Sequence, residues 1–458
     1  MPRSCLALIS LAILVVIITI TGCENLIHNS GTNTVNQVLI IRYDGPGEDD
    51  DGGQALASDN SGNIFISGYS WGNYTSCDYI TFKYDYSGNQ LWAARYDGPV
   101  NGQDWALDMA LDRESNVFVT GWSEGNGTGA DYATIKYDIE GSKRWVARYD
   151  GPGSSYDLAR ALAVDKTGNV YVTGWSTGNR TKADYATIAY DSEGNELWVA
   201  RYDGLIGNDD NAYDIDADYS GAVYVTGRSY GTDTGADYAT IKYDSRGNRL
   251  WIARYDGPVS GQDSAQAILV GDWGNINVTG WSEGNGTGSD YITIRYDSDG
   301  NEQWEARYNG PVSGEDKAYA ICRDSWSNIY VTGSSEGDGT GLDFITVKYD
   351  PSGHELWAER YDGPANGDDR ARSVILDGRG NVYVTGWSQG KGTGYDYATV
   401  KYSADGNQLW VTRYSGSSNA DDKTYAVTVD SLGNPWVTGR SIGNNTSYDY
   451  TTVRYVQQ

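Results

Sequence analysis

The chain has 458 residues, with 34 Lys and Arg against 62 Asp and Glu, so its formal net charge is −28. This acidic balance argues against nucleic acid as a partner, because binding to nucleic acid relies on basic side chains that neutralise phosphates. Aromatic residues make up 13% of the chain, and such large apolar rings supply the burial that a disordered chain lacks. Only two histidines occur, His28 and His354, which disfavours a serine–histidine–aspartate triad or a histidine-rich metal site.

Residues 1–22 have the pattern of a secretory signal peptide, with a basic start at Arg3 and an apolar run from Cys5 to Ile20. The run is short for a membrane-spanning helix, which needs about 20 residues, although an anchor helix is the alternative. The sequence Ile-Thr-Gly-Cys that ends at Cys23 resembles the lipobox of bacterial lipoproteins. This resemblance implies cleavage before Cys23, lipidation of Cys23, and, because Glu24 follows, location at the outer membrane if the cell has one.

Residues 23–37 are polar after the cysteine and show no periodic pattern, which predicts a flexible tether. From residue 38 to residue 458 the chain repeats itself every 53 residues, as the positions Arg148 and Arg201 illustrate. A fixed period of this size indicates a repeat architecture. We therefore expect three parts: a signal peptide (1–22), a lipidated cysteine with its tether (23–37), and a single repeat domain (38–458).

One repeat, residues 148–200, contains four segments with strand character: 159–164, 169–174, 184–190 and 196–202. Turn signals rich in Gly, Asn, Asp and Ser separate them. Four short antiparallel strands in each repeat are typical of a β-propeller blade. We name the four strands a to d in chain order, with a nearest the axis. The tryptophan of strand d, Trp198 in this repeat, is expected to wedge between blades, at a cost of ~3–5 kcal/mol if truncated to Ala.

The count of repeated elements predicts an eight-bladed ring. The Asp at the start of strand c occurs eight times, from Asp78 to Asp449, whereas the tryptophan of strand d occurs only seven times. The missing strand d is supplied by residues 38–43, so the N-terminal strand should complete the C-terminal blade and remove the open edges. The motif GNVYVTGWS…DYATIKYD…LW-ARYDG resembles the SBBP-type β-propeller repeat family, and the likeness covers residues 38–458. The turn before Trp198 also resembles the docking motif of eight-bladed quinoprotein propellers, although its Thr is absent.

The d–a and b–c connections are expected to be the long ones and to form the binding face, since long loops on a rigid scaffold commonly carry binding sites. A repeated carboxylate follows each Arg by nine residues. One interpretation is that each Arg binds two Asp in a structural network; the other is calcium, which takes six to eight oxygen ligands. The candidate metal ligands are Asp51, Asp104, Asp157, Asp210, Asp263, Asp316, Asp369 and Asp422.

The residue after Thr-Gly in strand b varies between repeats, unlike most positions around it. Aromatic and Arg side chains dominate this position, and both are common anchors in interfaces and sugar-binding sites. The alternative is that the rings only pack on the next blade. The candidate binding residues are Tyr69, Trp122, Trp175, Arg228, Trp281, Trp387 and Arg440, with Ser334 at the eighth position. If one repeat carries a special site, the loop near Asp209, Arg228 and Tyr230 departs most from the pattern.

These features favour a lipid-anchored, non-enzymatic scaffold of the cell envelope that binds a protein or a glycan, acts as a monomer and requires no cofactor. The alternatives are a propeller enzyme acting on polysaccharide, a quinoprotein-like dehydrogenase, or a purely structural surface protein. We assign no catalytic residue, because catalysis needs an asymmetric cluster and the repeats are uniform in length.

Overall fold

The computed structural model describes residues 35–47, 49–443 and 446–457. In this part of the chain the secondary structure consists of β-strands and one short 3₁₀ helix, η1 (Asp272–Gly274). Cys23 and the signal peptide predicted for residues 1–22 lie outside the described residues. No described helix is long and apolar enough to cross a membrane.

Most strands are grouped in four-stranded antiparallel sheets that follow the chain. The first three are β2 (Gly52–Ser58), β3 (Ile64–Trp71), β4 (Cys77–Tyr84) and β5 (Gln90–Tyr96); β6 (Asp104–Leu111), β7 (Val117–Gly125), β8 (Gly129–Tyr137) and β9 (Lys143–Tyr149); and β10 (Asp157–Val164), β11 (Val170–Thr177), β12 (Ala183–Tyr190) and β13 (Glu196–Tyr202). Two more are β14 (Asp210–Ala217), β15 (Val223–Tyr230), β16 (Ala236–Tyr243) and β17 (Arg249–Tyr255); and β26 (Asp369–Leu376), β27 (Val382–Gly390), β28 (Gly394–Tyr402) and β29 (Gln408–Tyr414).

Two consecutive sets of four strands are joined in one eight-stranded sheet. They are β18 (Asp263–Val270), β19 (Ile276–Gly284), β20 (Gly288–Tyr296) and β21 (Glu302–Tyr308), followed by β22 (Gly314–Arg323), β23 (Ile329–Gly337), β24 (Gly341–Tyr349) and β25 (Glu355–Tyr361). The link is a short parallel pairing of β20 with β22, in which Gly288 faces Gly314 and Ser289 faces Glu315. Each set otherwise keeps the same a-to-d order as the other sheets.

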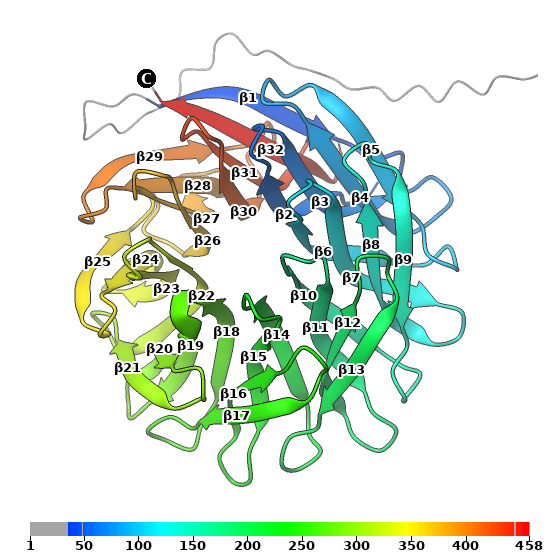
Figure 1. Cartoon of the computed structure of the whole chain (residues 1–458). Coiled ribbons are helices and arrows are strands. Elements are labelled where there is room, and N and C mark those ends of the chain that lie inside the picture. Colours follow the sequence, from blue (N-terminus) through cyan, green and yellow to red (C-terminus); the bar gives the residue numbers. More distant parts are fainter. Residues whose placement is uncertain (1–34, 48, 444–445, 458) are drawn as a thin grey trace, which may run out of the picture.

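The remaining sheet combines the two ends of the described chain. It has the order β1 (Val35–Tyr43), β32 (Tyr448–Gln457), β31 (Pro435–Ile442) and β30 (Asp422–Val429). Val35 pairs with Gln457 and Tyr43 with Tyr450, so β1 takes the outer place that strand d has in the other sheets. β1 begins three residues before the strand expected at residue 38, because the C-terminal strand is long enough to pair with these residues. Figure 1 shows β1 beside β32 and the sheets arranged around a common centre.

The four strands of the repeat at 148–200 lie where the pattern predicted them, as β10 to β13. Alternating apolar residues of β11 and β12 are buried between this sheet and its neighbours. The tryptophan of strand d lies at the junction between sheets: the ring of Trp198 packs against Tyr171 and Tyr243, and its indole N–H donates to the carbonyl of Ser245 at 3.2 Å. The predicted packing is therefore confirmed, although Trp198 is only half-buried.

The innermost strand of every sheet carries a β-bulge at the same place. In β10, Ala159 pairs with Gly174 and Ala161 with Thr173, so Arg160 between them has no partner on β11. A bulge releases one residue from the pairing and redirects its side chain. Because the innermost strands surround the centre of the molecule (Figure 1), these eight bulged residues form a ring around the axis. The sheets thus supply a repeated frame with one irregular position near the centre.

Candidate functional site

The repeated arginine binds one aspartate, in contrast to the network in which each Arg would bind two. Arg201 donates from Nη2 to Oδ2 of Asp184 at 2.8 Å and to the carbonyl of Ser176 at 2.8 Å. Its Nη1 donates to the hydroxyls of Ser176 at 2.5 Å and of Tyr149, on the preceding sheet, at 3.0 Å. All eight repeated arginines make the corresponding ion pair with the Asp that opens strand c. This network therefore joins strands within a sheet and links neighbouring sheets.

The second carboxylate of each repeat, the one predicted as a metal ligand, binds backbone N–H groups. Oδ2 of Asp157 accepts from Gly151 N at 2.6 Å, and Oδ1 accepts from Thr177 N at 3.0 Å. The carboxylate thus joins the d–a loop to the end of strand b. These two backbone N–H groups are its partners in place of the Arg201 guanidinium that the sequence suggested. All eight residues at this position are buried. In every repeat Oδ2 accepts from the N–H of the Gly six residues earlier, in Asp51, Asp104, Asp157, Asp210, Asp263, Asp316, Asp369 and Asp422.

Carboxylates nevertheless gather at these loops. In five repeats the strand a Asp, the strand c Asp and an exposed loop Asp place oxygens within 4.8 Å of one another, as Asp104, Asp78 and Asp97 do. Burial raises the pKa of Asp51 to about 7 and the pKa of Asp104 to about 6, against the lowering effect of their hydrogen bonds. The arrangement offers oxygen ligands, yet the strand c carboxylate already binds Arg and the strand a carboxylate already binds the backbone. The calcium interpretation remains a prediction.

The structure places the variable strand b residues at one end of the sheets, next to the innermost strand. Trp175, for example, faces Leu158 of β10 at the end of β11. Tyr69 and Trp387 are buried, with exposed fractions of 1% and 8%. The other candidate binding residues keep part of their surface exposed: Trp122, Trp175, Arg228, Trp281 and Arg440.

The strand b rings also contact the next sheet, so the packing alternative holds in part. Tyr69 stacks on Trp105 with centroids 4.0 Å apart, and Trp105 in turn lies parallel to Trp122 at 6.1 Å. Trp175 meets Tyr213 edge to face at 6.4 Å. Lys317 lies over Trp281 at 4.7 Å. The side chains that remain partly exposed therefore form a surface whose composition changes from repeat to repeat.

The b–c loops are shorter than the sequence suggested. β15 continues to Tyr230 and β16 starts at Ala236, so this connection is only residues 231–235, because the two strands keep pairing beyond the Thr-Gly step. The Gly-rich segment 126–131 lies at a tight hairpin closed by the pairing of Gly125 with Gly129. The residue singled out as unusual, Asp209, accepts from Ala183 N at 3.3 Å, a contact that Asp368 repeats with Leu342 N. These two features thus belong to the frame.

Sequence reasoning missed the ring of bulged residues. The bulged residue of strand a, such as Gln54 between Gly53 and Ala55, differs between neighbouring repeats, while the residues beside it are mostly small. This ring, which we call the axial ring, contains Gln54, Leu107, Arg160, Tyr213, Gln266, Tyr319, Arg372 and Tyr425. Arg160 is exposed and the other seven are partly exposed. A signal was available: in every repeat except the one with Leu107, a Gln, Arg or Tyr occupies this place in strand a, where a small apolar core residue would be expected.

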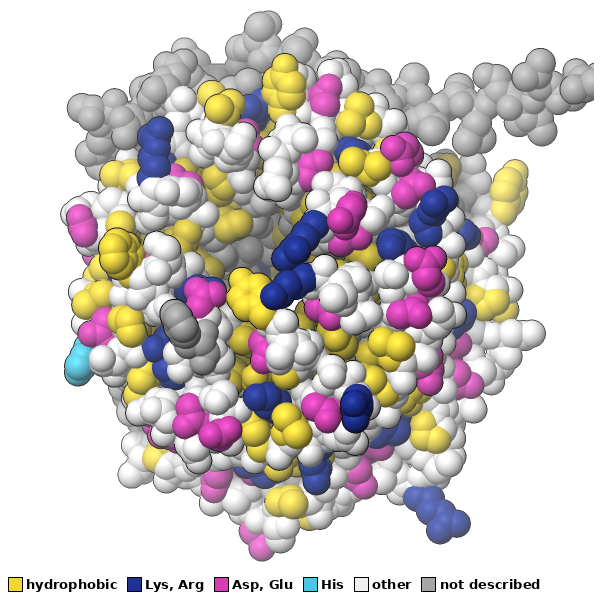
Figure 2. Space-filling view, viewed as in Figure 1, with side chains coloured by type: hydrophobic (Ala, Val, Ile, Leu, Met, Phe, Trp, Pro, Cys, Tyr) yellow, Lys and Arg dark blue, Asp and Glu magenta, His cyan; other side chains and the backbone are white. Residues whose placement is uncertain are grey.

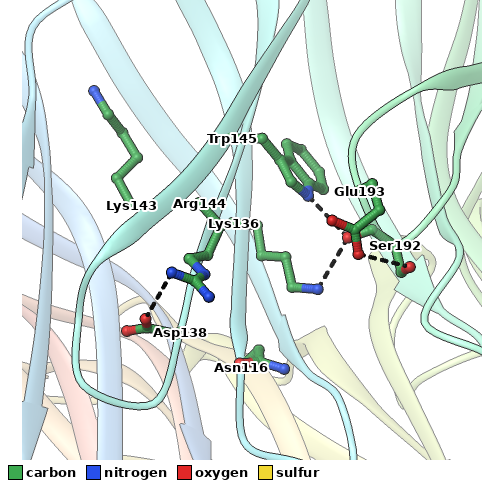
Figure 3. A pocket seen from close by; sticks show the side chains of 8 residues that line it. All are labelled: Asn116, Lys136, Asp138, Lys143, Arg144, Trp145, Ser192 and Glu193. Atoms are coloured by element: carbon green, nitrogen blue, oxygen red, sulfur yellow. Dashed lines mark hydrogen bonds and ion pairs between the residues drawn. The ribbon is translucent and has the colours of Figure 1, made fainter.

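A cavity of about 390 Å³ lies between β9 and the turn that follows β12. Figure 3 shows Lys136 and Trp145 directed at Ser192, whose carbonyl accepts from both, at 3.0 and 3.1 Å. Lys242 and Trp251 make the same pair of contacts with Ser298 two repeats later. A group that recurs in this way serves packing between sheets, so we do not assign the cavity a specific ligand. Figure 2 shows acidic, basic and hydrophobic side chains interspersed over one face of the molecule.

Repeated four-stranded antiparallel sheets around a common centre define a β-propeller. Residues 145–180 match the SBBP family, described as a beta-propeller repeat, so the chain contains a repeat of this type.

The chain is also similar to two curated proteins. It is 24% identical to the uncharacterized WD repeat-containing protein L264 of Acanthamoeba polyphaga mimivirus, over 66% of this chain and 31% of that protein. It is 32% identical to the regulatory protein FlaEY of Caulobacter vibrioides, over 26% of this chain and 13% of that protein. The chain therefore spans less than a third of the length of these relatives.

Among solved structures, a eukaryotic initiation factor is similar with a TM-score of 0.44 at 8% identity, covering 79% of this chain and 78% of that one. The α-L-arabinanase of Penicillium chrysogenum has a TM-score of 0.38 at 12% identity, covering 64% of this chain and 91% of that one.

Proposed function

We propose that this protein is a lipid-anchored β-propeller of the cell envelope that binds a glycan or a protein without catalysing a reaction. The observation that carries the proposal is the contrast between two sets of residues at one end of the sheets. Each repeated Arg forms an ion pair with the strand c Asp, and each strand a Asp accepts hydrogen bonds from backbone N–H groups. The partly exposed Trp and Arg side chains at the ends of strand b, in contrast, differ between repeats. Variation on an otherwise constant frame is expected where a ligand is recognised.

The frame is proposed to be a closed ring of eight blades. Two observations support closure: β1 pairs with β32 along its length, and Asp51 N donates to the carbonyl of Tyr448, which joins the first sheet to the last. The two sets within the eight-stranded sheet count as two blades, since β20 and β22 share only two residue pairs. A rigid ring fits a scaffold, because its loops are held in fixed relative positions.

Anchoring rests on the lipobox-like segment that ends at Cys23. In a cell with an outer membrane the domain is proposed to be held there by the lipid and the tether. Growth with an alkyne fatty acid should label the wild-type chain and leave a Cys23→Ser variant unlabelled. Equal labelling of both chains would contradict lipidation at this residue.

The binding surface is tested by crosslinked capture from the native envelope. The bait is the domain without its signal peptide, compared with a Trp122→Ala/Trp281→Ala variant. The matched control is Tyr219→Ala/Trp326→Ala, which removes two exposed rings from turns between the first two strands of other repeats. We expect the ligand to be lost only in the first variant. Loss in both variants, or in neither, would contradict the assignment of this surface.

A further inference from the structure

The axial ring has a twofold pattern. Residues 212 positions apart, which is four times the 53-residue period, are identical in three of its four pairs. The identical pairs are Gln54 with Gln266, Arg160 with Arg372, and Tyr213 with Tyr425; the fourth pairs Leu107 with Tyr319. In the eight-bladed ring proposed above, residues of one pair lie half a turn apart.

The same offset relates two clusters of four side chains. In the first, Arg160 lies over the ring of Trp175 at 5.9 Å, and Trp175 meets Tyr213 edge to face at 6.4 Å. In the second, Arg372 lies over the ring of Trp387 at 4.6 Å.

The edge-to-face contact is repeated there too, between Trp387 and Tyr425 at 5.9 Å. A further arginine lies on the strand that pairs with each tyrosine's strand: Nε of Arg228 donates to Asn211 Oδ1 at 3.2 Å, and Arg440 lies over the ring of Tyr448 at 4.2 Å. Burial dominates and raises the pKa of Tyr213 and Tyr425, while the charges of these arginines and of Arg160 and Arg372 lower it. Each cluster thus has the composition Arg, Trp, Tyr and Arg.

Within the described residues, none of the four cluster arginines makes an ion pair, although the chain carries a net charge of −28. Neighbouring basic residues on the same strands are paired: Lys317 with Glu315 at 3.0 Å and Lys423 with Asp421 at 3.4 Å.

Nε of Arg372 and of Arg440 is buried and has no hydrogen-bond partner there. Burial lowers the pKa of Arg372, and the charges of Arg370 and Arg160 lower it further. No described carboxylate pairs with these four guanidinium groups, and two of their buried Nε donors have no partner, so the clusters call for a counter-anion.

We propose that the two clusters are equivalent sites for the carboxylate groups of an acidic glycan. A guanidinium group binds a carboxylate with two parallel hydrogen bonds, and the indole and phenol rings offer apolar faces and a hydroxyl to a sugar. A polymer with a regular repeat presents the same acidic group twice, which suits two clusters of the same composition. This assignment rests on the proposed binding function and names its ligand class.

The test is the binding stoichiometry of trigalacturonate, measured by calorimetry at low salt, with its methyl ester as the uncharged control. We expect two molecules per wild-type chain, one for Arg160→Gln, one for Arg372→Gln and none for the double variant. Because guanidinium–carboxylate bonds depend on charge, the ester should not bind.

A matched control is Arg246→Gln/Arg379→Gln, which removes two exposed arginines from turns outside the clusters and changes the net charge equally. This control should still bind two molecules. Equal melting temperatures of the two double variants would show that the Arg160→Gln/Arg372→Gln chain is folded.

Failure of the ligand class is distinguishable from failure of the binding function. If trigalacturonate does not bind but the envelope capture still depends on Trp122 and Trp281, the glycan assignment is wrong and the scaffold proposal stands. If neither experiment detects a ligand, both are wrong. Two molecules retained by the double variant, or a captured protein whose binding requires Arg160 and Arg372, would also overturn the acidic-glycan assignment.

Discussion

Replacing Arg201 with leucine tests whether the repeated arginine network stabilises the fold. The side chain of Arg201 is 22% exposed and that of its partner Asp184 only 6%, so the variant leaves a buried carboxylate without its counter-charge. Removing one partner of a buried ion pair costs about 3–5 kcal/mol. Unfolding entropy of about 2.1 cal/mol/K per residue, over about 420 residues, converts each kcal/mol into about 1 °C. We therefore expect the melting temperature to fall by about 3–5 °C.

The measurement is calorimetry at neutral pH, with Arg144→Leu as the control. The Arg144 side chain is 62% exposed and lies 3.7 Å from Asp138, and an exposed pair of this kind contributes about 0–1 kcal/mol. A double Arg201→Leu/Asp184→Leu variant should recover part of the loss, because it removes the uncompensated charge as well. Equal shifts for Arg201→Leu and Arg144→Leu would refute the structural role of the network.

Trp198→Ala should cost ~2–3 kcal/mol, less than for a fully buried ring because the indole is half-exposed; a melting temperature equal to that of wild type would contradict its packing role. Burial raises the pKa of Asp51 to about 7 and of Asp104 to about 6, and because a raised folded-state pKa gives stability that is lost as pH rises through that value, the melting temperature should be higher at pH 5 than at pH 8; the reverse order would refute this. Millimolar calcium, compared with a chelator, should change the melting temperature by less than about 1 °C, since the repeated carboxylates already have partners; a rise of several degrees would instead establish the acidic groups as calcium sites. Deleting residues 1–43 should expose the edge of β32 and cause association between chains, seen by light scattering; a monomer with unchanged stability would contradict closure by β1.

The strands of the fold could be predicted because their signals are local and repeated. Alternating apolar residues in 184–190 and 196–202, with Gly-containing turns between them, specify β12 and β13 without knowledge of the rest of the chain. The part played by residues 38–43 could also be predicted, since the count of strand d tryptophans is one short. The pairing of β20 with β22 could not, because it depends on how closely two neighbouring sheets approach.

The candidate site was harder to predict for a physical reason. Sequence alternation assumes regular pairing, and a bulge interrupts it: Arg160 lies between two buried alanines and would be assigned to neither face of a regular strand. The partner of Asp157 was also misjudged, because a backbone N–H is present at every residue and leaves no trace in the sequence. The exposure of Trp122 and the burial of Trp387, which occupy equivalent positions, depend on the neighbouring sheet and not on the strand itself.

The pairing of Val35 with Gln457 brings the two ends of the domain side by side on the outermost strand position of one sheet. A short peptide could therefore join the natural ends, and the chain could be opened instead at a turn between strands c and d of any other repeat, such as residues 191–195. Every such circular permutant would keep the same hydrogen bonds between strands. A different outer strand would then take the place of β1 as the one that comes from the opposite end of the chain. The pairing of β1 with β32 thus makes the position of the chain ends separable from the packing of the sheets, and a permutant should have a melting temperature close to that of the wild type.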